Sequence, residues 1–120
     1  KMGYITSANE ILAKDDFTYA EIDVPEWGGT LRLRSLSGAQ RTIITARAQK
    51  NKVTGDGLYE QLIIMSAVDE DNKLIFDEKQ HLEMLKMRNS AITKKIGEKV
   101  LEISGFKPDA ESDIESAEKN

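Results

Sequence analysis

The chain contains no cysteine, and this absence excludes disulfide bonds, thiolate metal sites and cysteine nucleophiles together. It has one histidine and two prolines among its 120 residues. No apolar run approaches the roughly 20 residues that a membrane-spanning helix needs, and the N-terminus lacks the apolar segment of a secretory signal. We therefore expect a soluble cytoplasmic protein that folds without a metal or a disulfide and does not contact a membrane.

An excess of positive charge is also missing, because 21 acidic residues outnumber 17 basic ones and leave a formal charge of −4. This balance argues against a general nucleic-acid binder. Hydrophobic residues make up 39% of the chain, which is enough for one folded domain at this length. We predict a single α+β domain over residues 1–106. Residues 107–120 carry five acids and one large apolar residue, which predicts a mobile acidic tail.

Two segments, 19–24 and 30–34, alternate polar and apolar residues and predict an antiparallel hairpin around a Pro- and Gly-containing turn. A register with Glu26 opposite Gly29 matches apolar with apolar and acid with base across the strands. Its other pairs are Val24 with Leu31, Ile22 with Leu33, Asp23 with Arg32 and Glu21 with Arg34.

Three capping boxes, which begin at Ser7, Ser37 and Asp77, predict the starts of three helices. A strongly apolar segment predicts a fourth helix, with strand character near its end at Ala67–Val68 and a short extended piece at 74–76. The expected helices span 8–14, 38–50, 58–68 and 78–104. In the second helix, the residues expected to face inward are Ala39, Ile43 and Ala46, with Ile44 as a further candidate.

The longest expected helix, 78–104, has an apolar stripe that also contains Asn89, which must find a polar partner there. The apolar members of the stripe are Leu82, Leu85, Ile92, Ile96, Val100 and Ile103. The predicted fold is therefore α+β: an N-terminal short helix, an antiparallel β-hairpin, then three helices including a long C-terminal one.

Residues that could support catalysis are scarce. His81 has no nucleophile or metal ligand in a recognisable spacing, so a surface or helix-start role is favoured. Residues 69–80 fail the calcium-loop template at three positions, and no phosphate-binding glycine motif occurs. We expect no enzyme activity, no metal and no cofactor.

Trp27 and a methionine patch are the candidates for partner contacts. Trp27, at the hairpin tip, either packs back onto the core or stays exposed as an anchor, for which tryptophan is enriched. Met84, Met87 and Ala91 lie on a different helix face from the core stripe. Methionine suits adaptable interfaces, and both core packing and an interface remain open for this patch. We add Arg88, which lies beside Met87, as a tentative contact.

Basic residues are concentrated in residues 79–99, which contain six lysines and arginines and only two glutamates. The favoured interpretation is the solvated face of an amphipathic helix, and the functional one is a surface for an acidic partner. An alternative function is therefore a small regulator that binds nucleic acid through this basic face.

The order of the motifs resembles a known family. Residues 24–29 read VPEWGG, basic residues follow on the return strand, and residues 36–41 read LSGAQR. Residues 69–76 read DEDNKLIF, with Asn72 where the pattern leads us to expect glycine, and residues 103–106 read ISGF. Over residues 5–120 the chain resembles the tail assembly chaperones of tailed phages and prophages.

This resemblance implies a non-catalytic role in tail morphogenesis. Such chaperones bind the tape-measure protein, keep it soluble and help tail-tube subunits to polymerise around it. They act in the cytoplasm of the bacterial host and are absent from the mature virion. The resemblance also implies self-association into an oligomer. Many members of the family are made as a short form and a longer form by ribosomal frameshifting, and this chain would then be the short form or close to it.

Overall fold

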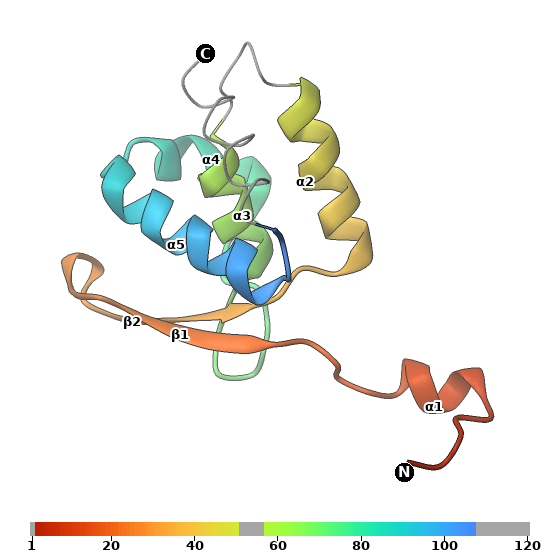
Figure 1. Cartoon of the computed structure of the whole chain (residues 1–120). Helices are drawn as coiled ribbons and strands as arrows, with labels where there is room; N and C mark the ends of the chain where they lie inside the picture. The colour runs from red at the N-terminus through yellow and green to blue at the C-terminus, as the bar shows by residue number, and fades with distance from the viewer. Residues whose placement is uncertain (1, 51–56, 108–120) are drawn as a thin grey trace.

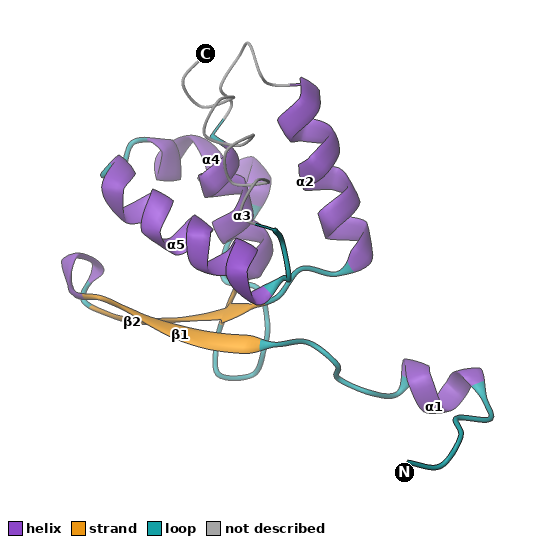
Figure 2. Ribbon diagram, viewed as in Figure 1, coloured by secondary structure: helices purple, strands orange, loops and turns teal. Residues whose placement is uncertain are grey.

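The computed structural model describes residues 2–50 and 57–107. These residues form an α+β fold, as predicted, with three antiparallel strands and, on one side of them, the helices that follow the hairpin (Figures 1 and 2). The elements are α1 (Ala8–Leu12), β1 (Tyr19–Val24), η1 (Pro25–Trp27), β2 (Gly29–Arg34), α2 (Gly38–Lys50), α3 (Leu58–Ser66), β3 (Ala67–Val68), α4 (Glu78–Lys86) and α5 (Ser90–Ile103). The predicted acidic tail lies, apart from its first residue, outside the described residues.

The hairpin forms where it was predicted, but its register differs from the prediction by two residues. Val24 lies opposite Gly29, Ile22 opposite Leu31, and Glu21 opposite Arg32. The predicted pairing of Glu26 with Gly29 was wrong because residues 25–27 form the 3-10 helix η1, which Gly28 closes in the left-handed region, with φ +85°. A shift of two residues leaves every side chain on its original face. Ile22 therefore still meets an apolar residue and Glu21 a basic one, whereas Asp23 lies opposite Thr30.

The third strand confirms the strand character expected at Ala67–Val68. Ala67 lies opposite Leu33, and Val68 opposite Arg32. Leu74 then bridges back to Val68 after a tight turn. Asn72 occupies the left-handed region in this turn, with φ 62°. Asparagine tolerates that conformation better than most residues, so the glycine of the expected pattern is not needed here.

The core is built around α3, which contacts α2, α4, α5 and β2. Eight of its nine residues are buried, among them Glu60 and Gln61. A helix that is apolar on nearly all sides must be surrounded by other elements, which explains its central place. The largest fully buried apolar side chains come from α3 itself and from β1, β2, α2 and α5. They are Val24, Leu33, Ile44, Leu58, Leu62, Ile63, Ile96 and Val100.

The inward face of α2 was predicted correctly at Ile44 and wrongly at the three other positions. Ala39, Ile43 and Ala46 are exposed, whereas Ile44 and Ala48 are buried. Contacts at the capping box determine which face of α2 points toward α3. Ser37 Oγ accepts from the Gln40 backbone N–H, and the Gln40 side-chain amide donates to the Met65 carbonyl at 3.1 Å. The positions one and two turns after residue 40 therefore face α3.

The predicted long helix is two helices, because the helical conformation is interrupted at residues 87–89. Asn89 is exposed and is the N-cap of α5, where its Oδ1 accepts from the Ala91 backbone N–H at 2.9 Å. Asparagine competes with the helical backbone in this way and favours a cap over a helix interior. The expected stripe is otherwise buried or half-buried on both helices.

Replacing Asn89 with alanine should remove the α5 cap and lower the free energy of unfolding by about 1 kcal/mol. Asn89→Asp keeps an accepting oxygen and is the matched control, so it should remain close to wild type. Urea unfolding followed by circular dichroism measures both. Equal stability of the alanine and aspartate variants would contradict the capping role.

Gly97→Ala should destabilise the packing of α5 on α3. An added Cβ would lie 2.5 Å from Tyr59 Cδ1, and the Tyr59 ring is buried and cannot easily move. Overpacking outweighs the better helix propensity of alanine, so we expect a net loss of about 1–2 kcal/mol. Gly38→Ala, at a helical glycine with nothing within 4 Å, is the control and should cost nothing. The same urea unfolding experiment measures both variants. Equal unfolding midpoints for Gly97→Ala and Gly38→Ala would contradict the overpacking at Gly97.

Candidate functional site

The methionine residues at the end of α4 lie on the surface. Met84 is 65% exposed and Met87 is 78% exposed. They border an open hollow of about 500 Å³, which we call the methionine hollow. Its lining residues are Phe76, His81, Met84, Leu85, Met87 and Arg88. Of the predicted contact residues, the structure thus brings Met84, Met87 and Arg88 together.

The other two predicted contact residues do not line this hollow. Ala91 is exposed at the start of α5, four residues after Met87 and beyond the break between the two helices. Trp27 lies in η1 at the hairpin tip, where its half-buried ring packs against the core. The structure therefore favours the core alternative for Trp27, and its role in partner binding stays a prediction.

The start of α4 is fixed by local hydrogen bonds. Asp77 Oδ1 accepts from the Gln80 backbone N–H at 3.1 Å, as the capping box predicted. His81 Nδ1, and not the Gln80 side chain, accepts from the Asp77 backbone N–H at 2.8 Å. The Phe76 ring meets the His81 ring edge-on, with centroids 5.8 Å apart. His81 thus has a structural role at the helix start, and it holds Phe76 at one side of the hollow.

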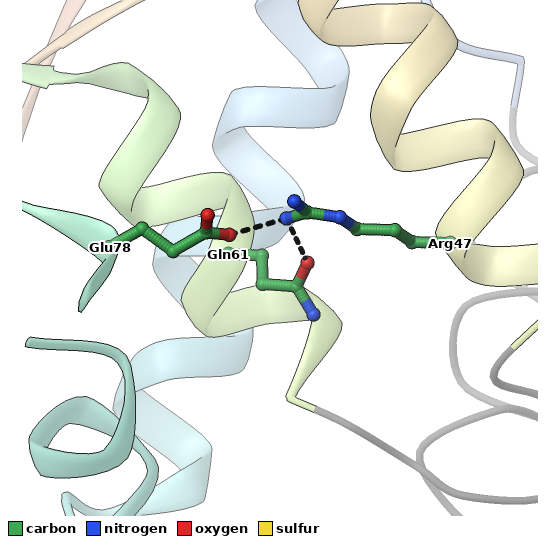
Figure 3. A network of polar contacts seen from close by, with 3 residues as sticks. All are labelled: Arg47, Gln61 and Glu78. Carbon is green, nitrogen blue, oxygen red and sulfur yellow. Dashed lines mark hydrogen bonds and ion pairs between the residues drawn. The ribbon is translucent and has the colours of Figure 1, made fainter.

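A polar network connects α4 to the rest of the fold (Figure 3). One guanidinium nitrogen of Arg47, in α2, donates to Gln61 Oε1 of α3 at 2.6 Å and to Glu78 Oε1 of α4. The Arg47 and Glu78 side chains are 35% and 44% exposed, so solvent screens their attraction and its net stabilisation is small. The network instead orients α4, and with it the methionine residues.

The basic residues of 79–99 are divided between two helices, and many have an acidic neighbour. Lys86 pairs with Glu83 at 3.5 Å, and Lys99 pairs with Glu102 at 3.3 Å. This pairing is typical of a solvated helix face. Within the described part of the chain, the Arg88 side chain has no hydrogen-bond or ion-pair partner, and it lies directly beside the methionine residues. Arg88 is therefore available for an acidic group on a partner.

Sequence reasoning missed a second apolar surface, the N-terminal arm, which we define as residues 2–16. Every residue of the arm is exposed, and α1 stands away from the sheet and the other helices (Figure 1). At the end of the arm, the Asp15 carboxylate accepts a hydrogen bond from the hydroxyl of Tyr19 in β1 at 2.7 Å. This hydrogen bond raises the pKa of Tyr19. The signal in the sequence was the pair Ile11 and Leu12 on a helix too short to bury them.

The described residues hold no group of three or more histidine, aspartate or glutamate side chains placed to bind a metal ion. None of the helices in the described ranges combines the length and the apolar character required to cross a membrane. The methionine hollow is an exposed apolar surface with a basic residue, Arg88, at its edge.

Comparisons with known proteins found a likeness in structure and none in sequence. No family model matches the chain, and no curated protein matches it. A solved structure, the tail assembly chaperone of bacteriophage HK97, superimposes with a TM-score of 0.57 at 15% sequence identity. The match covers 82% of this chain and 94% of that one. At this identity the likeness shows that the two proteins share a fold.

Truncating neighbouring residues of α4 should separate surface from core. Leu85 is 6% exposed, so Leu85→Ala should lower the free energy of unfolding by about 2–3 kcal/mol. Met84 is 65% exposed, so Met84→Ala should change it by less than about 0.5 kcal/mol. Thermal and urea unfolding of the two variants compare the same substitution at adjacent positions. A similar loss in both would show that Met84 belongs to the core.

Proposed function

We propose that this chain is a non-catalytic phage tail assembly chaperone that binds the tape-measure protein and assists tail-tube assembly. The observation that supports it most is the fold shared with the HK97 tail assembly chaperone over 82% of the chain. The motifs that resemble the family lie at conformationally demanding turns of this fold. VPEWGG forms η1 and the left-handed Gly28, and DEDN forms the turn with the left-handed Asn72.

The methionine hollow is the surface that we assign to the tape-measure protein. A long helical partner exposes apolar stripes before assembly, and helices commonly bind by placing such a stripe in an apolar groove. Met84 and Met87 have flexible side chains that adapt to varied apolar residues along such a stripe. Arg88 adds an ionic contact for acidic residues beside the stripe, and Ala91 leaves room for close approach. Trp27, at the hairpin tip, is a separate tentative contact.

Binding and release of an apolar partner need no nucleophile, metal or cofactor. The proposal includes self-association, contact with the tail-tube protein, and action in the cytoplasm of the bacterial host with absence from the mature virion.

Co-expression with the tape-measure protein encoded nearest to it tests the proposal. We expect the partner to stay soluble and to co-purify with this chain. The double variant Met84→Asp with Met87→Asp should reduce the co-purified partner about tenfold, since each change removes an apolar contact and introduces a charge. Ile43→Asp, at an apolar residue 42% exposed on α2, is the matched control and should behave as wild type.

Two results would contradict the proposal. A partner that stays insoluble with both this chain and a C-terminally extended form would argue against the chaperone function. If the wild type and the double aspartate variant solubilise the partner equally, the chaperone function stands but the methionine hollow is not its binding site.

A further inference from the structure

The strand β1 lies at the outer edge of the sheet (Figure 1). The strand order is β1-β2-β3, so one side of β1 has no strand beside it among the described residues. An unpaired strand edge presents backbone N–H and C=O groups that can pair with a further strand. Whether this edge can do so depends on which of its backbone groups point outward.

The hydrogen bonds of the hairpin identify the outward groups. The Ser35 backbone N–H donates to the Thr18 carbonyl at 2.8 Å, so these two residues form a hydrogen-bonded pair. Such pairs alternate with pairs that are not hydrogen-bonded along an antiparallel ladder. The register therefore directs the backbone groups of Tyr19, Glu21 and Asp23 away from β2.

The open part of this edge has an occupied group at each end. Lys95 Nζ, from α5, donates to the Asp23 carbonyl at 3.3 Å, which agrees with the outward direction of that carbonyl. At the other end, the Phe17 backbone N–H donates to the carboxylate two residues before it at 3.1 Å. Between these ends, the outward N–H and C=O groups of Tyr19 and Glu21 have no hydrogen-bond partner in the described part of the chain. They are free to pair with a short added strand.

A hollow of about 460 Å³ adjoins this edge on the helix side, and we call it the edge hollow. Its apolar lining residues are Ile22 of β1, Leu101 of α5 and Phe106. No lining residue in the described ranges belongs to β2 or β3, so the hollow lies toward the outer side of β1. Paired strands lie about 4.8 Å apart, and residues directly opposite each other point to the same face. An added residue opposite Ile22 would therefore direct its side chain into the edge hollow.

On the other face of β1 the edge is acidic. Glu21 and Asp23 are both exposed there. Glu21 lies opposite Arg32, but the Arg32 guanidinium stacks over the Tyr19 ring at 4.3 Å from its centroid. Within the described residues Glu21 makes no ion pair, so its carboxylate is available to a basic residue on an added strand. Opposite charges directly across two strands stabilise their pairing.

A second copy of β1 fits this edge poorly. Antiparallel pairing centred on Glu21 would place that residue opposite itself, and pairing centred on Ile22 would place Glu21 opposite Asp23. Like charges directly opposite each other destabilise a strand pair. The edge is instead complementary to a strand that alternates basic and apolar residues.

We propose that the free edge of β1 binds an extended segment of another protein by strand addition. The segment pairs its backbone with Tyr19 and Glu21. Its basic residues lie opposite Glu21 and Asp23, and an apolar residue between them enters the edge hollow opposite Ile22. The site is separate from the methionine hollow and takes an extended segment in place of a helix, so this proposal and the proposed function can fail independently.

A synthetic peptide tests the backbone pairing on the full chain. The probe is Thr-Lys-Val-Lys-Val-Lys-Thr, blocked at both ends and labelled for fluorescence anisotropy, for which we expect saturable binding. N-methylation of its lysines removes the N–H groups that face β1 and should weaken binding about tenfold, equivalent to one or two net hydrogen bonds. N-methylation of its valines blocks only N–H groups that face away from β1. This second peptide is the matched control and should bind as the parent does.

Two variants test the same edge from the protein side. Glu21→Pro removes an outward N–H that the hairpin does not use, and proline is tolerated at such edge positions. We expect it to weaken binding of the parent peptide about tenfold with an unchanged circular dichroism spectrum. Glu21→Lys should reverse the charge preference, so that a peptide with glutamate as its central residue binds about fivefold more tightly than the parent. A variant that merely failed to fold would not gain this affinity.

Several outcomes would overturn the proposal. Absence of saturable binding by the wild type would exclude strand addition. Equal weakening by the two methylation patterns would indicate a general attraction between charges, as would an unchanged preference in Glu21→Lys. Unchanged binding by Glu21→Pro would place the peptide elsewhere. A smaller sedimentation coefficient of Glu21→Pro than of the wild type would assign the edge to a second copy.

Discussion

The burial of α3 is the constraint on which the rest of the structure depends. This helix is buried on nearly all sides, because β2 of the sheet and the helices α2, α4 and α5 all pack against it. Its end is tied to the sheet by Ser66, whose hydroxyl donates to the Arg34 carbonyl and accepts from the Arg34 backbone N–H. Gly97 lets α5 approach the Tyr59 ring closely. The position of α4, and hence of the methionine hollow, follows from this packing.

The methionine hollow illustrates how polar contacts can position the helix that carries an apolar surface. Arg47 donates to both Gln61 and Glu78, while Asp77 and His81 fix the first turn of α4. These contacts lie at one end of α4 and leave the methionine side chains at the other end without packing partners in the core. A binding surface of this kind can be apolar and still belong to a well-positioned element. The shared fold with a phage chaperone does not by itself assign such a site, which has to be argued from these residues.

Features set by neighbouring residues could be predicted from the sequence, and features set by distant contacts could not. The helix starts after Ser7, Ser37 and Asp77 follow from hydrogen bonds that span three residues. The break at Asn89 was missed because the apolar stripe continues across it, and periodicity cannot distinguish a cap from an interior position. The hairpin register depended on the conformation of η1, which pairing arithmetic alone does not specify.

For the candidate site, the sequence indicated the methionine residues but left core and interface open. Their exposure depends on how α4 packs against α3, which no local pattern encodes. The inward face of α2 was missed for the same reason, since the contact of Gln40 with Met65 joins residues 25 positions apart. The arm went unnoticed because exposure of Ile11 and Leu12 is a property of the whole fold.

The distribution of sulfur in this protein has a consequence for its chemistry. Of the four methionines, Met2, Met84 and Met87 are exposed, and Met65 alone is half-buried against the core. Oxidants convert exposed methionine to its sulfoxide, a polar group that reductases can restore. Oxidation would therefore make both the arm and the hollow more polar while the Leu, Ile and Val residues of the core remain intact. Such damage would leave a folded chain whose contact surfaces alone are altered, and which repair could return to its original state.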